Sequence, residues 1–350
     1  MASKSITPML KTKVVILNWN GAELLSKFLP KVRASVPEEV CVVVADNGST
    51  DTSEEVVRGI DGVDWIALGE NYGFAEGYNR ALEGMEGDVF VLLNSDVEPT
   101  DGWLEPLVER LECAPEVAAV QPKILSESNR KMFEYAGAAG GYIDLYGYPF
   151  CRGRIMNSVE EDRGQYNSEA KVFWASGACM AIRAEAWRKA GGLDGEYFAH
   201  MEEIDLCWRL QIMGYDIEAC PRSVVYHVGG GTLPKSSPKK IYLNFRNSLA
   251  MLYKCLPKEE MWRLRRRKLM DWLSWGVYVL CGRWSFARSV HRAHRDARRM
   301  RQHLESERAK LWAQAVEPRP KTIYQHWVVL RYLIGETQFN MLRWPNNTPL

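Results

Sequence analysis

Residues 90–97 read Phe-Val-Leu-Leu-Asn-Ser-Asp-Val, and this stretch decides the fold that the chain is expected to adopt. Its four consecutive apolar residues predict a buried central strand. Asp96 comes just after them, where the strand leaves the core. Ligands of open α/β sheets bind at the carboxyl ends of the strands. A carboxylate at this position is therefore well placed to hold a hard cation of the kind that a diphosphate requires.

Two other apolar runs also end in polar residues. The run at 14–17 is followed by Asn18-Trp19-Asn20-Gly21, and the run at 40–45 by Asp46-Asn47-Gly48-Ser49-Thr50-Asp51. Strands expected near 13–18, 40–45 and 89–94 alternate with helical patterns near 22–35, 52–59 and 74–84. This alternation predicts an α/β fold with a mostly parallel central sheet flanked by helices.

The overall composition is that of an ordinary globular protein. With 350 residues, of which 46% are hydrophobic, the chain can form one large domain and an extension. Its net charge of +1 gives no reason to expect nucleic acid as a partner. The eight cysteines form no C-x-x-C pair, which argues against a zinc or dithiol site and for a reducing, cytoplasmic compartment. Residues 1–13 do not resemble a signal peptide, and no apolar run reaches the roughly 20 residues of a membrane span.

Six segments together resemble one protein family and occur in that family's order. They are 15–20 (Val-Ile-Leu-Asn-Trp-Asn), 44–51 (Val-Ala-Asp-Asn-Gly-Ser-Thr-Asp), 71–79 (Asn-Tyr-Gly-Phe-Ala-Glu-Gly-Tyr-Asn), 92–96 (Leu-Leu-Asn-Ser-Asp), 202–209 (Glu-Glu-Ile-Asp-Leu-Cys-Trp-Arg) and 227–230 (His-Val-Gly-Gly). The chain resembles the family 2 glycosyltransferases of the GT-A fold, in the rhamnosyltransferase-like branch of bacterial cell-surface polysaccharide synthesis. The resemblance covers about residues 11–255.

The resemblance implies a domain organisation. Residues 11–235 would form the Rossmann-like GT-A domain, with a donor half at about 11–125 and an acceptor half at about 126–235. Residues 236–350 would form a basic, amphipathic, helical C-terminal extension. Residues 126–170 lose hydrophobic periodicity, which predicts a long functional or mobile loop on the acceptor side.

The resemblance also implies a nucleoside-diphosphate sugar as the donor, with dTDP or UDP as the nucleotide. Asp46 would contact the nucleoside, although an acid in this position also commonly starts an Asx-turn. The other residues implied in donor binding are Asn18, Asn20, Asn71, Gly73, Asn79, Asn94, Ser95 and Arg246. Around Gly73 the alternative is a glycine-bearing turn before a helix. For Arg246 the alternative is a core-facing salt bridge.

A divalent cation, Mn²⁺ or Mg²⁺, is the implied cofactor. Asp96 would hold this ion, and the ion would bridge to both phosphates. Asn94 replaces the first acid of the family's Asp-x-Asp, so metal affinity is expected to be weakened and not abolished. His227 follows the run 223–226 and would either add an imidazole ligand or serve only the structure. The run Gly229-Gly230-Gly231 would form a lid over the diphosphate or a flexible linker.

The acidic stretch at 202–205 is implied to supply the catalytic base. The resemblance puts this role on Glu203, with Glu202 in support. At helical spacing Glu202 and Asp205 share a face, and Asp205 is expected to pair with Arg209 four residues later. The alternative is an exposed acidic helix start without a catalytic role.

These implications describe an inverting, metal-dependent glycosyltransferase. It would move a sugar, rhamnose by the resemblance, to a hydroxyl of a growing, lipid-linked glycan. A nucleotidyltransferase on a related α/β fold is one alternative, but that class uses a glycine-rich phosphate loop with a basic residue, which residues 18–21 do not provide. A non-catalytic saccharide-binding protein is another, and it would need neither Asp96 nor Glu203.

The C-terminal part shows helical patterns at 241–256, 259–282 and 283–310. The second pattern contains five cations, Arg263, Arg265, Arg266, Arg267 and Lys268, and then an apolar stretch at 272–280. Cations beside Trp and Leu favour a helix that lies in the plane of an anionic membrane surface, with the enzyme peripheral on the inner face of the plasma membrane. A helix packed against the catalytic domain is the alternative.

Overall fold

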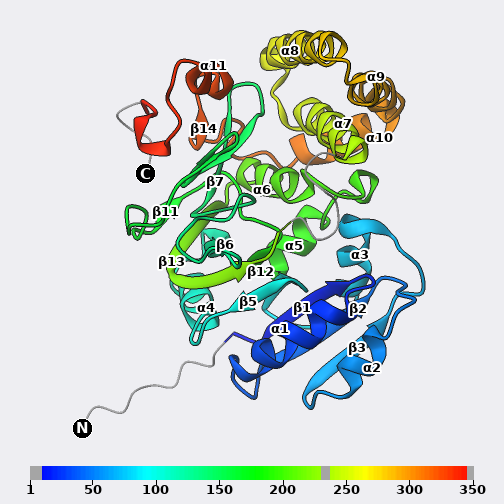
Figure 1. The fold of residues 1–350 in the computed structure, drawn as a ribbon, viewed down its shortest axis with the longest axis vertical. Helices are drawn as coiled ribbons and strands as arrows, with labels where there is room; N and C mark the ends of the chain where they lie inside the picture. The colour runs from blue at the N-terminus through cyan, green and yellow to red at the C-terminus, as the bar shows by residue number, and fades with distance from the viewer. Residues whose placement is uncertain (1–9, 230–236, 345–350) are drawn as a thin grey trace.

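The structure is a computed structural model and describes residues 10–229 and 237–344 (Figure 1). A nine-stranded sheet forms its centre, in the order β11-β13-β6-β12-β4-β1-β2-β3, with β5 paired to β13. These strands are β1 (Thr12–Asn18), β2 (Cys41–Asp46), β3 (Val63–Ala67), β4 (Val89–Asn94), β5 (Val97–Pro99), β6 (Val117–Ser126), β11 (Ala170–Lys171), β12 (Cys179–Arg183) and β13 (Asp216–His227). Strand β1 is parallel to β2 and to β4, and β2 is parallel to β3, as expected for an α/β fold.

Helices cover both faces of this sheet. They are α1 (Ala22–Ala34), α2 (Ser53–Arg58), α3 (Gly73–Leu82), α4 (Leu104–Cys113), α5 (Ala184–Ala190) and α6 (Glu202–Ile212). Val91 of β4 packs in the same cluster as α1 and α4, whereas Leu92 packs in the cluster that contains α3 and α6. Because alternate side chains of a strand enter opposite layers, a strand buried on both faces is a continuous apolar run. The expected strands and helices of residues 13–94 are confirmed to within two residues.

The long loop expected at 126–170 is in part a second, five-stranded sheet. Its strands, in the order β10-β9-β8-β7-β14, are β7 (Gly141–Asp144), β8 (Pro149–Cys151), β9 (Arg154–Ile155), β10 (Ser158–Val159) and β14 (Ile323–Tyr324). The strands have only two to four residues, which is too short for alternation of polar and apolar residues to be recognised. The expectation of an irregular loop was therefore wrong for 141–159.

The C-terminal part packs onto the same core as the sheet domain. It consists of α7 (Pro238–Cys255), the short η2 (Lys258–Glu260), α8 (Met261–Leu280), α9 (Trp284–Arg299), α10 (Arg301–Trp312), β14, α11 (Val328–Leu333) and η3 (Phe339–Met341). The single helix expected at 283–310 is two helices, which meet at Met300. Leu252, Leu304 and Phe339 join the core cluster of α6, and β14 pairs with β7. The expected domain boundary at 235 lies outside the described residues, and a division there stays a prediction.

None of the described helices is both long enough and apolar enough to cross a membrane.

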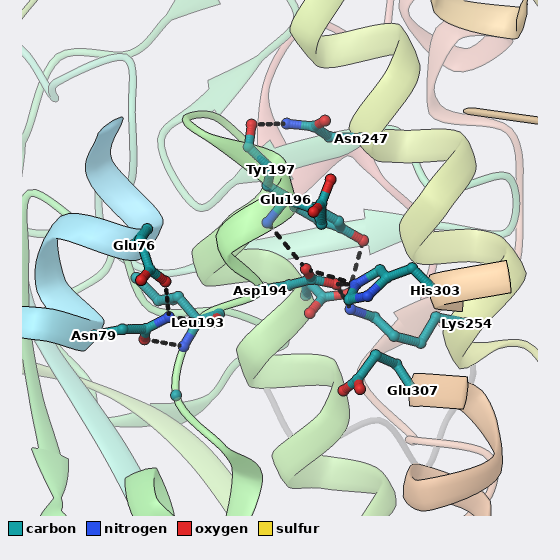
Figure 2. A network of polar contacts seen from close by, with 12 residues as sticks. Glu76, Asn79, Leu193, Asp194, Glu196, Tyr197, Asn247, Lys254, His303 and Glu307 are labelled. Carbon is teal, nitrogen blue, oxygen red and sulfur yellow. Dashed lines mark hydrogen bonds and ion pairs between the residues drawn. The ribbon is translucent and has the colours of Figure 1, made fainter. Parts of the chain in front are cut away.

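A buried network of charges joins α6 to the C-terminal helices (Figure 2). The ammonium of Lys254, on α7, lies 2.5 Å from Asp194 and 3.0 Å from Asp205. His303 of α10 contacts Asp194 at 3.0 Å, and Arg209 contacts Asp205 at 2.8 Å. Burial by itself would lower the pKa of Lys254, but the charges of Asp205 and Asp194 raise it, so the amine stays protonated.

Lys254→Met should therefore destabilise the protein. Methionine fills a similar volume but leaves Asp194 to His303 and Asp205 to Arg209, and removing one partner of a buried ion pair costs up to about 3–5 kcal/mol. Urea unfolding followed by circular dichroism measures the loss in the free energy of unfolding. Lys310→Met is the matched control, because Lys310 makes an exposed ion pair with Glu307 on α10. Equal urea midpoints for Lys254→Met and the wild type would contradict a stabilising role for the network.

Candidate active site

The carboxyl ends of β1, β2 and β4 bring polar side chains together at one edge of the sheet. Asn18 is in register with Asp46, and Leu17 with Asn94. The buried amide of Asn18 donates to Asp46 at 3.1 Å, and the backbone N–H of Ser49 donates to Asp46 at 2.9 Å. Asp46 thus makes the Asx-turn contacts of the alternative interpretation while lying within the expected pocket. Its contact with the nucleoside stays a prediction.

Within the described residues, the side chain of Asn18 has one polar atom without a partner. The Oδ1 atom of Asn18 is buried and has no hydrogen-bond partner in the described part of the chain, which is rare for a buried polar atom. A Cβ added to Gly21 would lie 2.4 Å from this oxygen and 3.6 Å from the hydroxyl of Ser95. Gly21 therefore approaches Asn18 so closely that a larger residue would displace this amide.

Trp19 and Asn20 follow Asn18 where the chain leaves β1. The carbonyl oxygen of the Asn20 side chain accepts from the backbone N–H of Thr50 at 2.8 Å, and Asn20 has a positive φ of 51°. This geometry turns the chain so that Trp19 is 48% exposed. An exposed indole at the end of a strand offers a flat surface on which a nucleobase can stack. Trp19 was missed as a site residue, although it stands inside the 15–20 motif.

The expected donor contacts from the α3 region are used mostly within the protein. Asn71 accepts from the backbone N–H of Gly73 at 2.9 Å, and the amide of Asn47, which was not expected in the site, donates to the Gly73 carbonyl at 2.9 Å. Gly73 has a φ of 80°, and a Cβ there would lie 2.6 Å from the ring of Phe198. Glycine is therefore required at this position by the close approach of Phe198, which is the glycine-turn alternative.

Asn79 does not fit the donor-binding role expected for it. Its amide nitrogen donates to the carbonyl of Leu193 at 2.8 Å, and the N–H of Leu193 donates back to the Asn79 oxygen at 2.9 Å (Figure 2). Both ends of the Asn79 side chain are thus engaged by the backbone of Leu193, in the connection between α5 and α6. Asn79 fastens α3 to this connection, which sequence spacing alone does not reveal.

Asp96 and His227 meet because β5 pairs with β13. His227 is in register with Val97, and the N–H of Val228 donates to the carbonyl of Asp96 at 3.1 Å. The Nε2 atom of His227 lies 3.0 Å from Asp96, and its Nδ1 atom lies 3.5 Å from Glu134. Burial alone would lower the pKa of His227, but hydrogen bonds and the charges of the two acids raise it to about 10. Burial opposes ionisation of Asp96 as well, yet the contact with His227 lowers the pKa of this carboxyl.

This pair fits the donor chemistry of a divalent cation. A carboxylate and a neutral imidazole are both ligands of Mn²⁺-type ions, so a cation bound here would have to displace the proton that His227 holds between Asp96 and Glu134. Hard cations fill their other positions with phosphate oxygens and water. Within residues 10–229 and 237–344 there is no group of three His, Cys, Asp or Glu side chains arranged to hold a metal. A cation here would therefore depend on the donor's phosphates for much of its coordination. Of the proposed lid, Gly230 and Gly231 lie outside the described residues.

Glu202 and Glu203 open helix α6 beside this strand edge. Glu202 is buried and Glu203 half-buried, and one oxygen of each carboxylate is buried without a partner in the described structure. Burial raises the pKa of Glu203 to about 7, and burial together with the charge of Glu203 raises that of Glu202 well above its ordinary value. A carboxyl group with a pKa near 7 is suited to accept a proton at neutral pH. The exposed helix start of the alternative interpretation does not match this burial.

Segment 176–178 lies between Glu203 and the carboxyl end of β4. A Cβ on Gly177 would lie 3.9 Å from the Cβ of Glu203. The carbonyl of the next residue, Ala178, accepts from the N–H of Asn94 at 3.0 Å. The candidate base thus lies beside a short piece of backbone that bonds to the first residue of the Asn94-Ser95-Asp96 turn.

Asp205 lies behind the site and not in it. Its carboxylate accepts from the hydroxyl of Tyr197 at 3.0 Å and contacts Lys254 at 3.0 Å and Arg209 at 2.8 Å. The expected pairing of Asp205 with Arg209 is confirmed. Because the side chain is fully buried and both oxygens are engaged, the catalytic contact expected of Asp205 does not fit, and a positioning role does.

The backbone just before α6 is strained. Phe198, His200 and Met201 have φ angles of 63°, 69° and 74°, a region that non-glycine residues rarely adopt. The Asn247 amide nitrogen, on α7, lies within hydrogen-bonding distance of three carbonyls, those of Tyr197 (3.1 Å), Ala199 (3.0 Å) and His200 (2.7 Å). This one side chain therefore holds the backbone conformation that places Glu202 and Glu203.

Arg246 supports the same segment. Its guanidinium donates to the carbonyls of Glu196 at 2.8 Å and Tyr197 at 2.9 Å. It is thus neither a core salt-bridge partner nor aimed at a phosphate in this conformation. The donor-binding role expected for Arg246 does not fit these contacts. The sequence could not show them, because they form only when the distant segment 196–200 folds back onto α7.

The comparison with known proteins decides the family. The model of glycosyl transferase family 2 matches residues 13–190. The chain belongs to this family. It is 28% identical over 231 residues to the N-acetylglucosaminyl-diphospho-decaprenol L-rhamnosyltransferase of Mycobacterium tuberculosis, covering 61% of this chain and 75% of that protein. It is also 22% identical over 221 residues to rhamnosyltransferase WbbL of Escherichia coli, covering 61% and 82%.

Solved structures show the same fold. A crystal structure of GalNAc-T7 with UDP, GalNAc and Mn²⁺ aligns with a TM-score of 0.57 at 16% identity, over 72% of this chain and about half (49%) of that one. TarS 1–349 of S. aureus in complex with UDP aligns with a TM-score of 0.52 at 17% identity, over 87% and 88%. The expected GT-A fold is confirmed, and the chain is a glycosyltransferase.

Asn247→Leu should slow glycosyl transfer without weakening nucleotide binding. Leucine keeps the shape but cannot donate to the three carbonyls, so the strained segment relaxes and moves Glu203, and a displacement of about 1 Å can cost up to about a hundredfold in rate. Steady-state kinetics and calorimetry with the nucleoside diphosphate separate the two effects. Asn244→Leu on the same helix is the control, because Asn244 bonds only to Lys240 of its own helix among the contacts described. An equal loss of affinity and rate would assign Asn247 a general structural role instead.

Proposed function

We propose that this enzyme is an inverting, cation-dependent glycosyltransferase that moves rhamnose from dTDP- or UDP-rhamnose to a hydroxyl of a lipid-linked glycan. The observation that carries the proposal is that Glu203 lies beside Gly177, next to Ala178, whose carbonyl accepts from the N–H of Asn94, two residues before the Asp96 that contacts His227. The names of the two rhamnosyltransferase relatives support the sugar, and the decaprenol in one of those names supports a lipid-linked acceptor. Action at the inner face of the plasma membrane is part of the proposal.

The donor would bind at the carboxyl ends of β1, β2 and β4. Asn18 and Asp46 would hold the nucleoside through their oxygens, and Trp19 would stack on the base. Asp96 and His227 would hold Mn²⁺ or Mg²⁺, which supplies positive charge to the leaving diphosphate when bound. The structure of GalNAc-T7 contains Mn²⁺ together with UDP, which is consistent with such an arrangement on this fold.

Glu203 would accept the proton of the attacking hydroxyl. A single displacement at the anomeric carbon needs one base on the acceptor side, and it inverts the configuration there. Glu203 is more exposed than Glu202, so it can reach an acceptor that Glu202 cannot. Glu202, buried behind it, would support the position and charge state of Glu203.

Asp96→Ala should remove cation-dependent donor binding and leave the fold intact. Loss of the only carboxylate on this strand end should weaken nucleotide affinity in the presence of Mn²⁺ by at least about tenfold, the usual scale for a disturbed metal site. Titration calorimetry with dTDP and with UDP, each with and without Mn²⁺, measures the change in affinity and identifies the nucleobase of the donor. Asp101→Ala, an exposed acid in the turn after β5, is the control. Unchanged affinity in Asp96→Ala would make Asp96 a turn residue only.

Glu203→Gln should lower the rate of transfer by at least about a hundredfold while nucleotide affinity is kept. Glu202→Gln should be milder. Since a base acts in its ionised form and burial raises the pKa of Glu203 to about 7, the wild-type kcat/KM should fall as the pH drops below about 7. Transfer of radiolabelled sugar at a fixed, saturating donor concentration measures the rates of the two variants and the pH dependence of the wild type. A larger loss in Glu202→Gln would move the base to Glu202.

A further inference from the structure

Helix α8 has its faces reversed relative to an ordinary surface helix. Its buried side chains are Arg263, Leu264, Arg267 and Asp271, three of them charged. Its exposed row is apolar and recurs at helical spacing: Leu269, Leu273, Val277 and Leu280. Leu273 is 62% exposed and Leu280 89%. A soluble helix gains nothing from this arrangement, so the exposed row calls for an apolar partner.

The buried charges fix α8 in this orientation. Arg267 contacts Asp271 at 2.8 Å, and Asp271 contacts His294 of α9 at 3.1 Å. Arg263 contacts Glu260 at 2.6 Å. Rotating the helix to bury its leucines would expose these partners and break their contacts. Two of the five cations expected to face lipid, Arg263 and Arg267, are therefore interior, and that part of the sequence interpretation was wrong.

The apolar row belongs to a larger docking face, which we define as Trp262, Leu269, Leu273, Val277, Leu280 and Trp284. Residues 262–284 hold more than half of the exposed large apolar side chains in the described part of the chain. Figure 1 shows α8 at one end of the molecule, far from β1 to β3. Trp at the ends of the row and Leu and Val along it are the pattern of a helix at a bilayer interface.

Cations outnumber acids along α8 and α9. Residues 261–301 contain twelve Lys and Arg but only two acids: Asp271 is buried, and Asp296 is engaged by Arg295 at 3.0 Å. Arg263, Arg267, Arg295, Arg299 and Arg301 are paired with acids, and the other seven Lys and Arg of residues 261–301 make no ion pair within the described structure. Burial and the nearby charges of Arg298 and Arg301 lower the pKa of Lys268. The face therefore complements a negatively charged surface. A second copy of the same face would oppose it with like charge.

We propose that the docking face rests on an anionic lipid bilayer, with α8 in the plane of the membrane. Its apolar row would enter the boundary of the acyl chains, and the exposed Arg265 and Arg266 would meet lipid phosphates. The inference deepens the proposed function, on whose lipid-linked acceptor it rests for its purpose. Helix α9 also contacts α7, the helix that carries Asn247, through a hydrogen bond of 3.1 Å from Tyr242 to Asp296.

Co-sedimentation of the full chain with vesicles tests the proposal, without donor or acceptor. The wild type should bind vesicles of phosphatidylcholine with phosphatidylglycerol at low salt, bind phosphatidylcholine alone weakly, and be released by high salt. Each Lys or Arg at an anionic surface strengthens binding by about fivefold, so Arg265→Glu with Arg266→Glu should weaken it by at least about thirtyfold. Leu273→Ser with Val277→Ser should weaken binding to both kinds of vesicle.

Matched variants control for surface chemistry in general. Val316→Ser in the segment after α10 and Arg58→Glu on α2 change exposed side chains outside the docking face and should bind as the wild type does. All variants should keep the wild-type rate with a soluble acceptor mimic and the wild-type melting temperature.

Three results would overturn the membrane proposal: no binding of the wild type to anionic vesicles, equal effects of the α8 and control variants, or an oligomer that Leu273→Ser with Val277→Ser dissociates in sedimentation velocity. The last result would make the docking face an interface between copies of this chain. Vesicle binding by a protein without transferase activity would uphold the membrane proposal and count against the proposed function.

Discussion

The buried ammonium of Lys254 between Asp194 and Asp205 is the contact on which the arrangement of the catalytic half depends. Two carboxylates in the interior cost several kcal/mol each unless a cation neutralises them with good geometry. That cation comes from α7, after the catalytic domain in the chain. Without the helices beyond residue 237, Asp205 would keep Arg209 of its own helix, but Asp194 would lose both Lys254 and His303. These helices are thus part of what stabilises the segment in front of α6.

Strain in front of α6 follows from the same arrangement. Three non-glycine residues with positive φ each cost about 1–3 kcal/mol, and such conformations persist only where the surroundings impose them. Asn247 and Arg246 impose them through five carbonyl contacts, and Lys254 fixes the helix that carries both. The result is that Glu203 faces segment 176–178 from a rigid helix start. Preorganisation of a base in this way lowers the cost of orienting it during the reaction.

The sequence predicted those features that depend on local pattern. Strands β1, β2 and β4 were recognisable because both of their faces are buried, and their polar ends were expected to meet because parallel strands end at one edge. Asp96, Asn18 and Asp46 were placed correctly at that edge for this reason. Their roles toward a ligand stay predictions.

What the sequence could not show depends on partners distant in the chain. Asn79 is committed to Leu193, more than a hundred residues away, and Arg246 to the carbonyls of 196–197. Arg267 has Asp271 four residues away, but its inward orientation also depends on the carbonyls of Tyr146 and Gly147, more than a hundred residues earlier. The same limit hid Glu134, which reaches His227 because the segment after β6 turns back, so that the Glu134 N–H bonds to Ile124 of β6, the strand that pairs with β13.

Helix α7 stands between the two surfaces that the proposed reaction would use. Asn247, on this helix, holds the backbone in front of Glu203, and Tyr242, near its start, contacts α9 beside the docking face. A lipid-linked acceptor keeps its reacting hydroxyl within a limited distance of the bilayer, so an enzyme that acts on it benefits from a fixed distance between lipid and base. In this chain packed helices would set that distance. Rigid helices lose less conformational entropy on docking than a flexible tether would, which favours transfer at the membrane surface over transfer in solution.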